Sequence, residues 1–206
     1  MSDLLRQSAL AYKELMPYRY IFTLGLRNKS YTVRLGFPEN AFYHLSGLHK
    51  MGIAALKRDK APLQKILEGK VTQEMVRKAG VDIEDRWIGI CRLKNMLENN
   101  QIVFQYRSNH HRGSIIKAEY LISDEETLFF IHGESPASIF GQKHQGYEAG
   151  CPRMTVLRIQ KEKTETGEIE EIYRYEISEG KTKTREYTPN APNKVFFMLR
   201  SPPPAK

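Results

Sequence analysis

Residues 31–51, YTVRLGFPENAFYHLSGLHKM, hold the clearest junction between a strand and a helix in this chain of 206 residues. Tyr31, Val33, Leu35 and Phe37 alternate with mostly polar residues, which predicts a strand with one buried face. Proline suits the first turn of a helix, so we expect the chain to turn at Pro38 into a short helix. The rest of the fold is interpreted outward from this junction.

The segments before the junction predict a helix and a strand. Residues 3–16 carry an apolar stripe at helical spacing, and Pro17 ends it. Residues 18–26 alternate as a strand and reach the polar turn at 27–30, so they predict a hairpin with residues 31–37. After the junction, short helices are expected within residues 61–79, and a longer helix is expected from Asp82 to about Leu97, with Trp87 as a core anchor.

The second half of the chain predicts strands. Residues 102–107, 114–122 and 127–133 are expected to form an antiparallel meander, followed by an irregular segment at 134–152. Hairpin strands are expected at 153–163 and 169–177, and further strands at 181–188 and 194–200. We therefore expect a single α+β domain over residues 1–206, with N-terminal helices and a hairpin followed by an antiparallel β-meander sheet.

Composition limits the class of protein. The formal net charge is +8, from 32 Lys and Arg against 24 Asp and Glu, and this favours a polyanionic partner. No apolar run approaches the ~18 residues of a membrane span, and no signal-peptide pattern is evident, so we expect a soluble cytoplasmic protein without a membrane partner. The phosphate-loop, dinucleotide-binding and nucleophile-elbow motifs are absent, and we expect no cofactor.

Two histidines lie in the expected helix after Pro38. His44 falls at the margin of the apolar face, where packing can orient a ring that also faces solvent. An imidazole that titrates near neutrality can act as a general acid or base. His49 falls within the apolar face, so a core-edge histidine with a hydrogen-bond partner is as good a reading as a functional one. Lys50 lies beside it and points away.

Basic residues of the expected sheet are candidates for phosphate binding. Lys117 is expected to share a strand face with Glu119, where a lysine can stabilise a charged transition state. Arg107 and Arg153 are candidates from charge and placement alone. The histidines of the 109–112 turn fit either a phosphate site or a solvated turn, and they lack the ligand spacing of a metal site.

A short motif resembles a known family. At residues 33–50 the chain is similar to predicted phage-associated nucleases of the barnase–EndoU–colicin–RelE group, which share an F-x-HL-x-GL-x-K segment after a strand. The matching positions here are Phe42, His44, Leu45, Gly47, Leu48 and Lys50. The resemblance implies a nuclease-like core at residues 18–161, and it leaves residues 162–206 as a C-terminal β extension with a proline-rich tail.

The resemblance implies a metal-independent, toxin-like endoribonuclease in which the ribose 2′-OH attacks the adjacent phosphate. Of the candidate residues, only His44 is carried over from the motif. We assign His44 and Lys117 to catalysis, and Lys50, Arg107 and Arg153 to RNA binding. A neutralising protein partner is left open. The alternatives are a non-catalytic module that binds nucleic acid or protein, and an enzyme acting on another phosphate-containing substrate.

Overall fold

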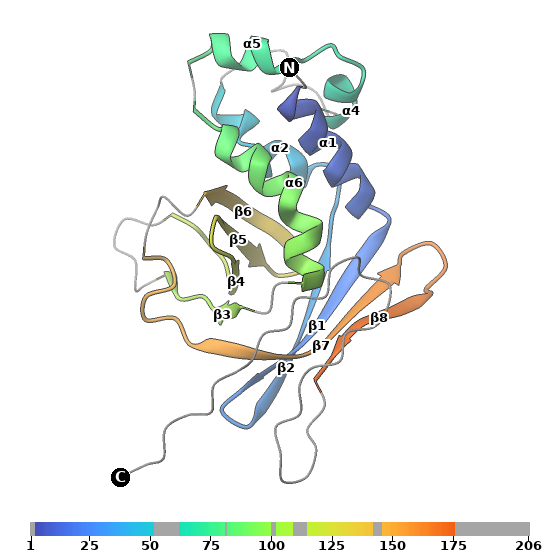
Figure 1. The fold of residues 1–206 in the computed structure, drawn as a ribbon, viewed down its shortest axis with the longest axis vertical. Helices are drawn as coiled ribbons and strands as arrows, with labels where there is room; N and C mark the ends of the chain where they lie inside the picture. The colour runs from blue at the N-terminus through green and yellow to red at the C-terminus, as the bar shows by residue number, and fades with distance from the viewer. Residues whose placement is uncertain are drawn as a thin grey trace.

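The computed structural model describes residues 3–51, 62–80, 82–99, 102–108, 115–141 and 146–175. Helices gather at one end of the molecule, and an antiparallel, curled sheet forms the rest (Figure 1). The predicted α+β class, with N-terminal helices and a hairpin before a meander, is therefore confirmed. The expected strands at 181–188 and 194–200 lie outside the described residues, as do the histidines of the 109–112 turn.

The helical layer contains one long α6, with α1 beside it and shorter helices around their ends (Figure 1). The helices are α1 (Leu4–Leu15), α2 (Ala41–Leu45), the 3₁₀ helix η1 (Leu48–Met51), α4 (Pro62–Leu67), α5 (Gln73–Lys78) and α6 (Glu84–Asn99). The side chain of Asp3 caps α1 by accepting a hydrogen bond from the backbone N–H of Arg6. Among the described helices, none has the length and apolar character needed to cross a membrane.

The sheet contains both the N-terminal hairpin and the meander, which lie far apart in the sequence. Its strands are β1 (Tyr18–Leu26), β2 (Lys29–Gly36), β3 (Val103–Gln105), β4 (Tyr120–Ser123), β5 (Thr127–His132), β6 (Ser135–Gly141), β7 (Arg153–Lys163) and β8 (Ile169–Arg174). The spatial order is β2-β1-β7-β3-β4-β5-β6, with β8 also paired to β7. β7 thus links the N-terminal hairpin to the meander, as Figure 1 shows.

The N-terminal hairpin forms where it is predicted, but its turn is tighter than expected because β2 already begins at Lys29. Leu26 pairs with Lys29, and the two residues between them, Arg27 and Asn28, have positive φ values of 49° and 62°. Two consecutive left-handed residues make the tight turn that matches the twist of antiparallel strands. At the far end of the hairpin, the N–H of Gly36 donates to the carbonyl of Glu134 at 2.9 Å. This contact brings the end of β2 to the β5–β6 turn and curls the sheet.

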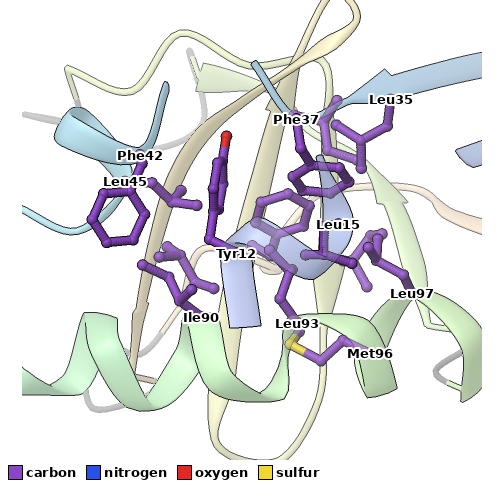
Figure 2. Close-up of a cluster of buried hydrophobic side chains, with 14 of the residues drawn as sticks. Tyr12, Leu15, Leu35, Phe37, Phe42, Leu45, Ile90, Leu93, Met96 and Leu97 are labelled. Carbon is purple, nitrogen blue, oxygen red and sulfur yellow. The ribbon is translucent and has the colours of Figure 1, made fainter. Parts of the chain in front are cut away.

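The strand-to-helix junction is fixed by aromatic packing. Tyr12 of α1 meets Phe37 edge-on at 5.7 Å between ring centroids, and it meets Phe42 of α2 at 5.3 Å. Its hydroxyl donates to the carbonyl of Pro38 at 2.8 Å. Figure 2 shows these side chains together with the apolar face of α6. The labelled residues of α6 in this core are Ile90, Leu93, Met96 and Leu97, all fully buried.

Helix α6 packs closely against both α2 and the sheet. The fully buried Trp87 donates its indole N–H to the carbonyl of Ser46 at 3.1 Å, which confirms the predicted core role and adds a polar contact. On the sheet side, a Cβ added at Gly89 would lie 3.0 Å from side-chain atoms of Ile139 and Thr127. Glycine therefore permits the close approach of α6 to β5 and β6.

Two strand predictions in the meander are wrong. Residues 115–118 are not part of a strand, and β4 begins only at Tyr120. Residues 134–152 are not wholly irregular, because they contain β6. Pro136 and the small residues of β6 resemble a loop in sequence. The strand forms because it is at the edge of the meander and because Pro136 pairs beside the register shift at Phe130 and Ile131, where proline is tolerated.

The Trp87 contact can be tested by stability. Trp87→Phe leaves the buried Ser46 carbonyl without its donor and removes core volume, so we expect the free energy of unfolding to fall by about 2–4 kcal/mol. Chemical denaturation measures this loss. The control is Ile88→Ala on the exposed side of α6, with an expected change within about 0.5 kcal/mol. Equal effects of the two substitutions would contradict the assigned contact.

Candidate functional site

The helix after Pro38 is interrupted, and the interruption shapes the site. The sequence predicts one continuous helix, but α2 ends at Leu45 and η1 begins at Leu48. Between them, Gly47 has φ +79°, and its N–H donates to the His44 carbonyl at 3.1 Å. Glycine adopts this left-handed conformation without a steric cost, so it ends α2 and redirects the chain.

The break brings the two histidines together. The rings of His44 and His49 lie 4.9 Å apart between centroids and are inclined at 43°. The ring of Tyr43 contacts both of them, at 5.6 Å and 6.3 Å. His44 is exposed, as an acid–base residue requires, whereas His49 is partly buried. A regular helix would have separated two side chains five positions apart, so this pairing depends on the turn at Gly47.

His49 differs from the expected core-edge histidine. Its Nδ1 is buried and makes no hydrogen bond with any described residue. Burial lowers the pKa of His49, and the nearby His44 lowers it further, with smaller contributions from the charges of Arg86 and Lys50. The backbone of Tyr43, in contrast, raises the pKa of His49. Burial and these positive neighbours therefore disfavour the protonated form of the His49 ring.

Arg86 reaches the histidine pair from α6. Its Nη1 donates to the carbonyl of Leu45, the last residue of α2, at 3.3 Å. A Cβ at Gly47 would lie only 2.8 Å from the Cδ of Arg86, so the arginine stem passes directly against the glycine turn. The guanidinium carbon lies 5.8 Å from the ring centre of Phe140, within cation–π range. Three contacts from two elements thus orient this side chain.

The site is cationic. Burial lowers the pKa of Lys50, and the charge of Arg86 adds to this effect. Asp85 is the carboxylate that opposes it, but its oxygens accept from the backbone N–H groups of Gly141, at 3.0 Å, and Arg86, at 2.9 Å. Asp85 thus anchors α6 to the end of β6. We define the cationic cluster as His44, His49, Lys50 and Arg86.

The remaining predicted site residues lie in or near strands of the sheet. Arg107 is two residues past β3, Lys117 is three residues before β4, and Arg153 is the first residue of β7, where it pairs with Phe104. All three predicted residues are exposed. Among the described residues, no hydrogen bond, ion pair or ring contact joins them to the cationic cluster. The structure therefore groups two of the predicted residues, His44 and Lys50, and leaves three apart from them.

The expected sheet-face partnership of Lys117 with Glu119 is also wrong, because neither residue is in a strand. Glu119 instead pairs with Nδ1 of His132 at 3.1 Å and accepts from the N–H of Gly133. The side chain of His132 is 59% exposed, so this histidine is a surface residue. Within the described residues, no group of three or more His, Cys, Asp and Glu is placed to hold a metal ion.

Arg86 was not a candidate from the sequence, although a signal is present. It lies three residues after Ile83, which directly precedes α6, and four before Ile90 on the apolar face of α6, and both isoleucines are buried. A basic residue at that spacing falls within the buried stripe of a helix, where a charge needs a specific reason. His49 carries no comparable signal, because its contact with His44 depends on the break at Gly47.

The electrostatics of the pair can be tested by NMR titration. We expect the His49 ring to titrate below its ordinary pKa of about 6.5. The unfolded chain then binds more protons than the folded chain in this interval, so the His49 contribution to stability is present above pH ~6.5 and is lost as pH falls through the folded pKa. His44→Ala removes a positive neighbour and should raise the His49 pKa. His132→Ala is the control and should not. A His49 pKa at or above 6.5 would contradict the assigned burial.

Comparison with known proteins identifies a family. No curated protein and no solved structure matches the chain significantly. A family model described as "phage-Barnase-EndoU-ColicinE5/D-RelE like nuclease4" matches residues 4–190. This range includes the 18–161 core suggested by the sequence resemblance and extends beyond it on both sides, through all of the described helices and strands. The chain therefore belongs to this family of phage-associated nucleases of the barnase–EndoU–colicin–RelE type.

Proposed function

We propose that this protein is a metal-independent endoribonuclease that cleaves RNA by transesterification. The observation that carries the proposal is the exposed His44 ring, which lies 4.9 Å from a second histidine inside the cationic cluster of a nuclease-family protein. Nucleic acid is the substrate class of the family, and a cluster of basic side chains suits its phosphates. The choice of RNA rests on the 2′-OH chemistry that an acid–base histidine can assist.

The proposed reaction needs two proton transfers. The ribose 2′-OH loses its proton as its oxygen attacks the adjacent phosphorus, and the bond to the 5′-oxygen of the next nucleotide breaks. That leaving oxygen gains a proton, and the products are a 2′,3′-cyclic phosphate and a free 5′-OH. His44 carries one of these protons as general base or general acid. Assistance of this kind contributes typically ~10²–10⁴ in rate.

The substrate-binding part of the proposal extends over two surfaces. Lys50 follows His49 in η1, so we assign it to the RNA segment nearest the reacting phosphate. We assign the exposed Arg107 and Arg153 to phosphates further along the strand, and Lys117 to the charge that develops in the transition state. Phosphate contacts of this type weaken steeply with salt, because binding releases counterions.

The mechanism predicts RNA cleavage in the presence of EDTA. His44→Ala should lower the cleavage rate by about 10²–10⁴-fold while the fold is retained, because one proton transfer loses its side-chain carrier. A gel assay measures the rate, and mass spectrometry of the products identifies the 2′,3′-cyclic phosphate. The matched control is His132→Ala, which removes an exposed histidine on the sheet and should leave the rate unchanged.

Two results would overturn the mechanism: cleavage that requires an added metal ion, or cleavage that survives His44→Ala at full rate. An RNA whose single 2′-OH at the cut site is replaced by hydrogen should resist cleavage, since the attacking group is missing. Salt-sensitive binding to RNA or DNA without any cleavage would instead favour the alternative of a non-catalytic nucleic-acid-binding module.

A further inference from the structure

We propose that Arg86 is the principal phosphate-binding residue of the site, with Lys50 and the histidine pair completing an anion-binding site formed by α2, η1 and α6. The inference rests on the proposed function only in taking the anion to be a phosphate group of the nucleic-acid strand. It assigns a role to a residue that the motif at 42–50 does not contain.

The first argument is the absence of an acidic partner. Arg86 is partly buried, yet its guanidinium forms no ion pair with an Asp or Glu among the described residues, and the guanidinium's one hydrogen bond there is to the Leu45 carbonyl. The charge of Asp85 acts on Arg86, but the Asp85 oxygens accept from backbone N–H groups. The arginines of the described residues that do pair with a carboxylate are Arg19, Arg77, Arg92, Arg158 and Arg174. A guanidinium stays protonated near neutral pH, so burying it without a counterion costs free energy unless a ligand supplies one.

The second argument is the accumulation of positive charge. Arg86 is close enough to His49 and Lys50 to lower the pKa of both, and the ring of His44 contacts that of His49. Asp85, the carboxylate whose charge acts on Lys50 and Arg86, is engaged with backbone N–H groups of Gly141 and Arg86. The apolar ring of Phe140 faces the guanidinium from β6. A bound anion would offset the mutual repulsion of the Arg86 and Lys50 charges.

The third argument is that Arg86 is held in place before any ligand binds. The Leu45 carbonyl uses one N–H group, the glycine turn at Gly47 admits the arginine stem, and the Phe140 ring lies against the guanidinium. The free N–H groups of a guanidinium match two phosphate oxygens in a bidentate geometry that an ammonium group cannot reproduce. In the proposed reaction, the same donors would face the negative charge that grows on the phosphoryl oxygens.

The test uses a short 2′-deoxy oligonucleotide, which carries the phosphates but lacks the attacking hydroxyl. Arg86→Gln should weaken its binding by about 10- to 100-fold, and Arg86→Lys should lie between this variant and the wild type, because the charge is kept and the fork is lost. The matched control is Arg92→Gln on the same helix, which removes the same charge from an arginine paired with Asp124 and Glu126. Its binding should change by less than twofold.

A second readout does not depend on the stability of any variant. In the wild-type protein, saturation with the oligonucleotide should raise the His49 pKa measured by NMR, because a phosphate next to Arg86 neutralises the charges that lower it. An unmoved His49 pKa, or equal binding by Arg86→Gln and the wild type, would overturn the proposal. Binding that depends on Arg86 in a protein that cleaves no RNA would support the anion-binding site while removing the proposed ribonuclease function.

Discussion

The structure depends on the contact between α6 and the end of α2, where the buried indole of Trp87 donates to the Ser46 carbonyl. This hydrogen bond satisfies a carbonyl at the end of a five-residue helix, which is too short to be stable alone. It also fixes the rotation of α6. Arg86, the residue before Trp87, is therefore directed at Leu45 and Gly47. Gly89, two residues after Trp87, faces the sheet.

One close approach thus connects the core with the candidate chemistry. The turn at Gly47 has to leave room for the Arg86 stem, and the same turn brings His49 back onto His44. Core packing and the placement of charge depend on the same helix, because α6, whose apolar face fills the core in Figure 2, also carries Arg86. A site built on a helix packed in this way is held more rigidly than one built on a surface loop.

Much of the fold could be predicted from local patterns. The hairpin of β1 and β2 follows from strict alternation around a polar turn, and α6 follows from its apolar spacing with Trp87 on the buried face. His44 was found because a motif accompanies it. The pairing of β7 with both β1 and β3 could not be predicted from local sequence patterns, since strand partners distant in sequence are chosen by tertiary packing.

The rest of the site depends on contacts that helical periodicity cannot represent. Treating residues 41–51 as one helix separates His49 from His44, whereas the glycine break joins them. A single strand over residues 114–122 would place Lys117 on one face of the sheet, but Lys117 is not in a strand. In both cases the error lies where a regular element ends early, and element ends are the least certain feature of a sequence pattern.

The pairing of β1 with β7 has a consequence for folding during synthesis on the ribosome. Arg19 and Glu162 lie on adjacent strands but are separated by 143 positions in the chain. Contacts this distant in sequence are slow to form, and a ribosome delivers the chain from its N-terminus at about 5–20 residues per second. The N-terminal hairpin, which leads into the histidine pair, therefore cannot pair with β7 until synthesis has passed residue 163. A nuclease organised in this way completes its sheet late in translation, after the elements that carry its candidate site have been synthesised.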